Sequence, residues 1–556
     1  MKKNRILWLL LALLLSTKIV VAEENSEDIS AILNGMTLEQ KIGQMFLVSI
    51  YGETLNFGGR ELIETWQPGG VTLFGSNAIN PTQITELTNS YQQTITEAGG
   101  VPLFIATDQE GGIITRLRDG FAEWPSPALL TASGDAELAF RIGERMGQEL
   151  RAVGVNMNLA PVADLDSNVN NPIIGRRSPG SHLDLLRVTL PAYIEGLQSA
   201  GVAATTKHFP GHGDTDEDSH LTLPVIHADL DTLYERELQP FISAISAGTS
   251  AIMMAHIWFS ELDEEVIPAS LSPRIVTDLL RDELGYEGII MTDAMEMNAI
   301  TSRYRPEESA LMAIEAGVDM LAFGTGMGAG AQSRMMQALV DAVRAGDIAE
   351  SRIDESVRRI LTAKAYHGIL DWSPLDSSSA DVRINVDEST QLIDSLFRAG
   401  VTLAFDHGEL LPVTPDQTLL LLYPSIRPRI NWTCHEYRQG GQWSSVPVFS
   451  APSDDDINAA IQRAEHVDVV IVFTDDARDD RAYQRLVNAL PQARTVAVAL
   501  RSPYDLLTYP DVAAYLITYS PQNPAIDVAC AIIFGEMTAQ GTISVNLPIL
   551  SAILSD

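Results

Sequence analysis

The sequence predicts an α/β protein in which a (β/α)8 TIM-like barrel is followed by a smaller α/β sandwich domain. Between residues 30 and 370, short apolar runs alternate with helical patterns eight times. From residue 390 to 556, further buried-strand runs alternate with helices, which is typical of a second, parallel α/β layer. A chain of 556 residues is long enough for two or three domains.

The eight expected barrel strands are short apolar runs. They are residues 44–50, 70–74, 103–107, 155–159, 203–209, 251–255, 288–292 and 318–323. Helical patterns lie between most of them, at 135–152, 184–200, 228–247, 273–284 and 306–316. Eight such units fit one closed barrel better than an open doubly wound sheet, and in a barrel the chemistry lies just after the strands.

A polar stretch at residues 375–381, which contains three consecutive serines, predicts a linker after the barrel. The second domain then has four expected strands, at residues 418–423, 467–473, 495–500 and 513–518. The acidic run at 453–456 is interpreted as the exposed start of a helix.

The N-terminus has the three-part layout of a secretory signal. Basic Lys2, Lys3 and Arg5 precede an apolar run at residues 6–15, and small residues ending at Ala22 come before acidic Glu23. We therefore expect residues 1–22 to be a signal peptide and the protein to be secreted or held in the cell envelope. An uncleaved membrane anchor remains the alternative.

Charge and cysteine content narrow the function classes. The chain has 73 acidic and 37 basic residues, a net charge of −36, so we expect no nucleic acid partner. The two cysteines, Cys434 and Cys530, allow at most one internal disulfide and no cysteine-based metal framework. Two buried thiols are an equally acceptable interpretation.

The loop after the fifth strand concentrates groups that can transfer protons. Residues 207–220 hold three histidines, several carboxylates and Lys207, a lysine in the middle of the chain. Asp218 and His220 can meet if the loop turns, and a carboxylate on an imidazole raises its pKa and fixes its tautomer. This pair is our candidate for general acid/base catalysis.

Three other strand ends carry polar side chains. Asp293 ends the seventh strand, where a carboxylate is a candidate nucleophile, although it could instead cap the next helix. Asp108 ends the third strand, with Arg116 eight residues later, and the loop after the fourth strand contains residues 171–178. The barrel loops thus supply polar groups to one rim.

These segments resemble glycoside hydrolase family 3, and within it the β-N-acetylglucosaminidase branch. The similarity also includes residues 36–45 near the N-terminus, residues 352–361 after the eighth strand, and residues 534–536 with 541–548 near the C-terminus. The loop that ends in Asp218-Ser219-His220 is the most specific part, because related β-glucosidases take their acid/base from a glutamate elsewhere.

The resemblance implies a function and a role for each candidate residue. It implies a retaining β-N-acetylhexosaminidase, without a cofactor or metal, that acts on peptidoglycan fragments, chitooligosaccharides or glycan termini. Asp293 would be the nucleophile, His220 the acid/base and Asp218 its partner. Other side chains would hold the N-acetylglucosamine: Asp108, Arg116, Arg177, Lys207 and His208. Pro179 departs from the family pattern, which usually has an aromatic residue there.

Alternative functions would use other groupings of residues. A metal site would use His208, His212 and His220 with Asp214 or Asp218, and a nucleotide site would use the GxGxxA pattern at 326–331. A β-glucosidase, a phosphorylase and a non-catalytic cell-wall binding protein are further alternatives. Because a neutral imidazole base does not repel an anion, phosphate could compete with water, held by Lys207 or by the glycines after the eighth strand.

Overall fold

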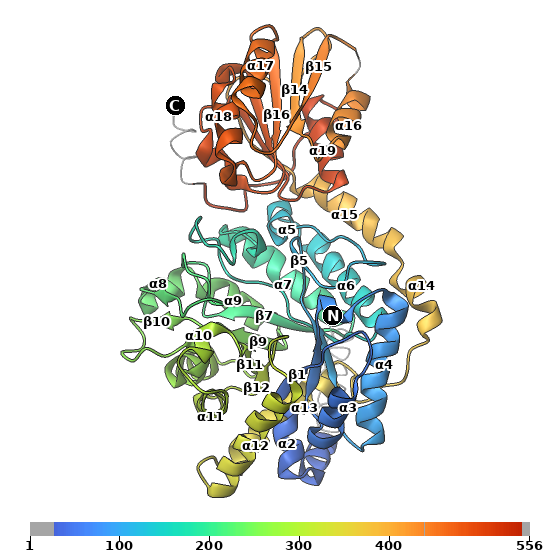
Figure 1. Cartoon of the computed structure of the whole chain (residues 1–556), viewed down its shortest axis with the longest axis vertical. Coiled ribbons are helices and arrows are strands. Elements are labelled where there is room, and N and C mark those ends of the chain that lie inside the picture. Colours follow the sequence, from blue (N-terminus) through green and yellow to red (C-terminus); the bar gives the residue numbers. More distant parts are fainter. Residues whose placement is uncertain (1–26, 439, 548–556) are drawn as a thin grey trace, which may run out of the picture.

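The computed structural model describes residues 27–547 except residue 439 (Figure 1). The expected signal peptide, residues 1–22, lies outside the described residues. No helix in the described part of the chain is long and apolar enough to cross a membrane.

Eight parallel strands form a closed barrel in the order β1-β12-β11-β9-β7-β6-β3-β2. Each of the eight apolar runs expected in the barrel overlaps one of them, so the expected barrel is confirmed. The strands are β1 (Phe46–Ser49), β2 (Gly70–Leu73), β3 (Phe104–Thr107), β6 (Met157–Asn158), β7 (Ala203–Phe209), β9 (Ala251–Met254), β11 (Ile289–Ala294) and β12 (Met320–Ala322). Side chains from both faces of these strands are buried, as in β7, because helices cover the outside and side chains fill the inside.

Helices surround the barrel (Figure 1). They are α2 (Leu38–Gln44), α3 (Phe57–Trp66), α4 (Pro81–Glu97), α5 (Pro127–Ser133), α6 (Ala136–Ala152), α7 (Leu183–Ser199), α8 (Leu230–Glu235), α9 (Leu238–Ser246), the π-helical η4 (Arg274–Glu283), α10 (Asn298–Thr301), α11 (Pro306–Ala316), α12 (Ala329–Ala345) and α13 (Glu350–Tyr366). Residues 27–35 form a further helix before α2.

The single helix expected at residues 228–247 is wrong. The structure has two helices there, because Arg236 leaves the helical conformation with φ −127° and ψ −76°. A proline ring clashes with the carbonyl four residues before it, and Pro240 stands four residues after Arg236. The second helix therefore starts at Leu238 and keeps Pro240 in its first turn.

The second domain contains a six-stranded sheet in the order β13-β18-β17-β16-β14-β15, in which only β13 is antiparallel to its neighbour. Its strands are β13 (Thr402–Asp406), β14 (Leu419–Pro424), β15 (Trp443–Val448), β16 (Val469–Thr474), β17 (Thr495–Ala499) and β18 (Ala514–Ile517). Its helices are α16 (Arg429–Tyr437), α17 (Asp454–Ala464), α18 (Arg481–Ala489) and α19 (Asn523–Ile533). Figure 1 shows α17 and α18 on one side of the sheet and α16 and α19 on the other, so the expected α/β sandwich is present.

The segment expected to be a linker is partly helical. Residues 377–379 form a 3₁₀ turn, and α14 (Ala380–Ile384) follows directly. The longer α15 (Val386–Gly400) then packs on α5 and α6 of the barrel and on α19 of the second domain. The connection is therefore an ordered helical bridge.

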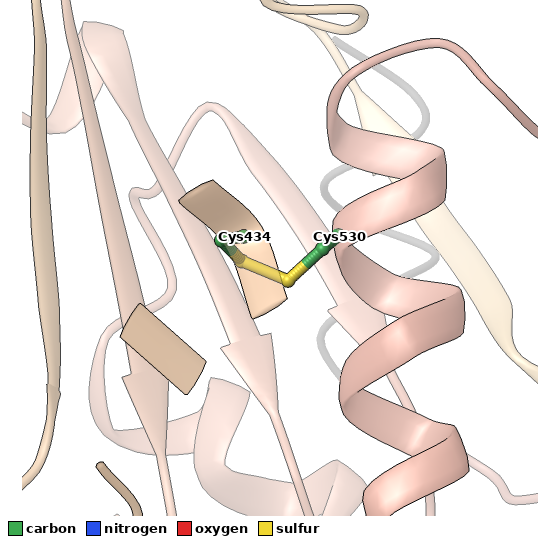
Figure 2. Close-up of a disulfide and its surroundings, with 2 residues drawn as sticks. All are labelled: Cys434 and Cys530. Carbon is green, nitrogen blue, oxygen red and sulfur yellow. A yellow bond between two sulfur atoms is a disulfide. The ribbon is translucent and has the colours of Figure 1, made fainter. Parts of the chain in front are cut away.

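A disulfide joins Cys434 in α16 to Cys530 in α19 (Figure 2). Both cysteines are fully buried. The bond ties together two helices that lie 96 residues apart in the sequence, and so closes most of the second domain into one covalent loop.

The second domain holds the barrel loop that follows β6. The Tyr504 hydroxyl donates to buried Asp166 at 2.7 Å, and Arg176 pairs with Asp476 at 2.7 Å. Gly180, at φ +111°, lies so close to the second domain that a Cβ there would approach the Ser544 carbonyl oxygen to 2.2 Å. The course of this loop is thus determined by contacts with residues 300 or more positions away in the sequence.

Candidate active site

The ends of β3 and β7 meet in a buried ion cluster. The Lys207 ammonium lies 2.8 Å from Asp108 and 2.7 Å from Glu110. Arg177 reaches the same Glu110 carboxylate with two N–H groups, at 2.9 and 2.8 Å. Burial works against the charged form of Glu110, but Lys207 and Arg177 outweigh it and lower its pKa to about 2.

Arg116 joins this cluster through a short hairpin of β4 (Gln109–Gly111) and β5 (Ile114–Thr115). The Gln109 side chain accepts the backbone N–H groups of Arg116 and Leu117, both at 3.1 Å. The Arg116 guanidinium thereby lies 3.6 Å from Asp108, with its side chain 37% exposed. The cluster therefore offers fixed cationic donors around two carboxylates, Asp108 and Glu110, an arrangement that binds hydroxyl and amide groups of a ligand.

His208 is held from behind by Asp164. The fully buried Asp164 carboxylate accepts from His208 Nδ1 at 2.6 Å and from the His212 backbone N–H at 2.7 Å. Because Asp164 takes Nδ1, the other nitrogen, Nε2, faces the cavity, where it lies 4.0 Å from an Asp293 carboxylate oxygen.

Asp293 stands at the end of β11 as a carboxylate that stays ionised. Its side chain is 23% exposed, and one of its oxygens accepts the Ala294 backbone N–H at 2.7 Å. Burial works to raise the pKa of this carboxyl, but His208 and His256 outweigh burial and hold the pKa of Asp293 at about 2. At neutral pH the group is therefore a permanent anion that faces the cavity, as a nucleophile must be.

His220 and Asp218 form the expected pair. Asp218 accepts from His220 Nδ1 at 2.9 Å and from the His220 backbone N–H at 2.7 Å. The His220 side chain is 59% exposed, so its Nε2 is accessible to a ligand.

The first part of this loop is anchored rather than free. A Cβ at Gly213 would approach the Leu165 carbonyl oxygen to 1.8 Å, so no larger residue fits there. His212 is buried and its Nε2 lies 2.9 Å from the Ser219 hydroxyl.

One cavity of about 630 Å³ brings the candidates together. Seven of the eight side chains singled out from the sequence line it: Asp108, Arg116, Arg177, Lys207, His208, His220 and Asp293. Asp218 does not line the cavity but contacts His220. A volume of this size is typical of sites for small ligands.

Part of the glycine-rich segment after β12 is already hydrogen-bonded to a carboxylate. Glu296, which also lines the cavity, accepts the backbone N–H groups of Gly324 at 3.0 Å and Gly326 at 3.1 Å. A phosphate-binding loop needs its N–H groups free for the ligand. The N–H groups of Gly324 and Gly326 are therefore not free to bind the phosphate of a nucleotide at 326–331 or inorganic phosphate.

No group of three or more histidine, cysteine or acidic residues within the described ranges could hold a metal ion. His212, one of the ligands considered above, is instead hydrogen-bonded to Ser219 inside the loop.

Comparison with known proteins bears on this geometry. The family model described as the glycosyl hydrolase family 3 N terminal domain matches residues 37–363. The chain belongs to glycoside hydrolase family 3. The chain is 28% identical over 545 residues to "Beta-hexosaminidase A" of Pseudoalteromonas piscicida, and the matched stretch is 88% of this chain and 90% of that protein.

Two further proteins show the same likeness. The structure of a beta-N-acetylglucosaminidase from Paenibacillus sp. str. FPU-7 superposes with a TM-score of 0.81 and 34% identity, over 92% of this chain and 99% of that one. "Beta-hexosaminidase" of Stenotrophomonas maltophilia (strain K279a) is 34% identical over 283 residues, which is 50% of this chain and 82% of that protein.

Sequence reasoning missed three residues of this family 3 site: Glu110, Asp164 and His256. His256 is buried directly after β9, with Nδ1 2.7 Å from Ser270 Oγ and Nε2 3.1 Å from the Ala294 carbonyl oxygen. A polar residue just after a barrel strand was a usable signal for His256. Asp164 comes a few residues after β6 in the same way, whereas the role of Glu110 depends on partners far away in the sequence.

Proposed function

We propose that this family 3 protein is a retaining β-N-acetylhexosaminidase that removes terminal β-linked N-acetylglucosamine from glycans. The observation that carries the proposal is the ionised Asp293 carboxylate in the same cavity as the His220–Asp218 pair. The names of the compared proteins, beta-hexosaminidase and beta-N-acetylglucosaminidase, support the same conclusion.

In the first step, an Asp293 oxygen attacks the anomeric carbon while protonated His220 gives its proton to the glycosidic oxygen. The bond from the anomeric carbon to that oxygen breaks, the alcohol leaves, and the sugar is bound to Asp293 as an ester. Asp218 stabilises the imidazolium before the proton is transferred.

In the second step, neutral His220 removes a proton from water, and the oxygen of that water attacks the anomeric carbon. The ester bond breaks, Asp293 becomes a carboxylate again, and the sugar leaves with its original anomeric configuration. The same imidazole is therefore acid in one step and base in the next.

The buried ion cluster would orient the sugar. Lys207 and Arg177 are fixed by Glu110 and can donate to ligand oxygens, while Asp108 accepts hydroxyl protons. A sugar epimer that leaves one of these buried donors unpaired loses about 1–3 kcal/mol. The site therefore selects the configuration of the ring as well as its size.

We further propose that the protein works outside the cytoplasm, after removal of residues 1–22. The Cys434–Cys530 disulfide supports this location, because such bonds persist in oxidising compartments. Peptidoglycan turnover is one pathway in which a secreted enzyme of this type would act. Sequencing the N-terminus of protein recovered from its own host tests the location: Glu23 is expected, and Met1 in a membrane fraction would contradict it.

The test of the activity compares an aryl β-N-acetylglucosaminide with the matching aryl β-glucoside. We expect hydrolysis of the aryl β-N-acetylglucosaminide with retained configuration, which NMR of the released sugar measures. Asp293→Asn should lower kcat by several orders of magnitude without unfolding the protein. Asp278→Asn, at an exposed carboxylate on η4, is the matched control and should keep full activity. Near-normal activity of Asp293→Asn would remove this residue from the mechanism.

A further inference from the structure

A second, smaller cavity of about 170 Å³ adjoins the main one. It lies between three neighbouring barrel loops, those after β1, β2 and β12. Phe74, Ser76 and Thr325 line both cavities, so the two are in contact along a shared wall. Nothing in the mechanism described above uses this smaller cavity.

The small cavity differs from the main one in its charge. Among the described residues that line it there is no lysine, arginine, aspartate or glutamate. Its wall is built from aromatic, amide, hydroxyl and aliphatic side chains, such as Tyr51, Asn56, Ser76 and Met327. In a chain with a net charge of −36, a wall without charges is a distinct environment.

Its polar and aromatic groups are available to a ligand. Tyr51 is 76% exposed, although large aromatic side chains are more often buried. Ser76 and Thr325 are exposed residues, and their hydroxyls make no hydrogen bond to the part of the chain that the structure describes. An aromatic face next to free hydroxyl groups suits a pyranose ring, which has apolar C–H faces and a polar edge.

Strand β2 provides a further, independent observation. Thr72 lines the main cavity and is only 2% exposed. Its hydroxyl is buried and has no hydrogen-bond partner within the described chain. A buried hydroxyl without a partner costs free energy that a bound ligand can recover. It lies on the same strand whose end carries Phe74 and Ser76 to the small cavity.

The position of the small cavity determines which part of a substrate would occupy it. The groups that would hold the cleaved sugar come from β3, the loop after β6, and β7. In the closed barrel, β1 and β12 lie across from β6 and β7. A substrate whose cleaved sugar is held at β3, β6 and β7 can therefore reach the small cavity with its leaving group, across the wall formed by Phe74, Ser76 and Thr325.

We propose that the small cavity is the subsite for the second sugar of the substrate, and that this sugar is uncharged, with Tyr51 as its stacking platform. The inference rests on the proposed function. It assigns the enzyme to neutral β-linked N-acetylglucosamine oligosaccharides rather than to fragments in which the second sugar carries a carboxylate. Carboxylates near the rim would repel such an anion: Glu53 lies on the Tyr51 loop, and Glu296 holds the Thr325 loop.

The experiment compares Tyr51→Ala with wild type on three substrates. The first is N-acetylglucosaminyl β-fluoride, whose leaving group is too small to reach the small cavity. The second is N,N′-diacetylchitobiose, and the third is the disaccharide in which N-acetylglucosamine is linked to N-acetylmuramic acid. Tyr366→Ala is the matched control, because Tyr366 is 73% exposed and lies at the end of α13, away from both cavities.

Tyr51→Ala should lower kcat/KM for diacetylchitobiose about threefold to tenfold and leave the fluoride unchanged. Wild type should prefer diacetylchitobiose to the muramic acid disaccharide by about tenfold or more. Tyr366→Ala should leave all three rates unchanged.

The opposite outcomes separate the two proposals. If wild type cleaves none of the three substrates, the proposed function itself fails. If wild type is active but Tyr51→Ala changes the fluoride and the disaccharides equally, or changes none of them, the subsite is wrong. If the muramic acid disaccharide is the better substrate, the uncharged second sugar is wrong.

Discussion

Glu110→Gln should destabilise the barrel and weaken catalysis together. The Glu110 side chain is 1% exposed and compensates two buried cations, Lys207 and Arg177. Glutamine keeps the shape but removes the charge, and its NH₂ group would face N–H donors. Breaking a buried ion pair on one side costs about 3–5 kcal/mol.

The pKa of Glu110 gives a similar magnitude. It falls from 4.5 to about 2 in the folded protein, and each pKa unit corresponds to about 1.4 kcal/mol. The charge of Glu110 therefore stabilises the fold by about 3 kcal/mol at neutral pH. Because the folded pKa lies below the unfolded value, this stabilisation is complete above about pH 4.5 and is lost as the pH falls toward 2.

Urea unfolding followed by circular dichroism measures the effect, and hydrogen exchange of the β3 and β7 peptides assigns the transition to the barrel. The variant should lose about 3 kcal/mol at pH 7, and its difference from wild type should shrink below about pH 4.5. Glu307→Gln is the control, since Glu307 makes only an exposed pair with Arg334 at 3.5 Å and should change stability by less than about 1 kcal/mol. Equal stability of Glu110→Gln and wild type at pH 7, or a difference that persists at low pH, would refute the reasoning.

Three further expectations concern the disulfide, pH and phosphate. Replacing Cys434 and Cys530 together by serine should lower the unfolding free energy of the second domain by about 4–5 kcal/mol, because the bond closes a loop of 96 residues; unchanged urea transitions of that domain would be inconsistent with this. The glycosyl fluoride needs little protonation of its leaving group, so its kcat/KM reports on Asp293. Because the pKa of Asp293 is about 2, protonation of Asp293 should not lower this kcat/KM until about pH 3. An apparent pKa between about 4 and 5 in the pH profile would argue against Asp293 as the nucleophile. Phosphate should compete with water for the glycosyl enzyme, so sugar 1-phosphate should rise with phosphate concentration; free N-acetylglucosamine alone at every concentration would exclude this reaction.

The barrel could be predicted because its strands are apolar on both faces. Ile289 and Ile290 are fully buried, one toward the helices and the other toward the barrel interior, so the run is visible without any tertiary knowledge. By contrast, β15 was missed because it lies at the edge of its sheet and alternates exposed residues such as Ser444 with half-buried ones. Local hydrophobicity does not identify such an edge strand.

The site could be predicted in part, because barrel chemistry follows the strands. Asp293 was found from that rule. Lys207 was singled out as a lysine in the middle of the chain, and the resemblance to family 3 supplied the role of His208. Glu110 was not singled out, because what defines it is a shared contact with Lys207 and Arg177, each 67 or more residues away. The course of the loop that carries Arg177 could not be predicted from the sequence either, because contacts with the second domain determine it.

The contacts of the second domain with the loop after β6 have a consequence for any attempt to shorten this enzyme. The Stenotrophomonas relative is shorter than this chain, since 283 residues make up 82% of it. Cutting this chain back to its barrel would remove the Tyr504 hydroxyl from Asp166 and the Asp476 carboxylate from Arg176. The barrel of this protein thus depends on the second domain for the position of one of its active-site loops. A shorter protein built on this barrel would need new contacts to hold the loop that carries Arg177.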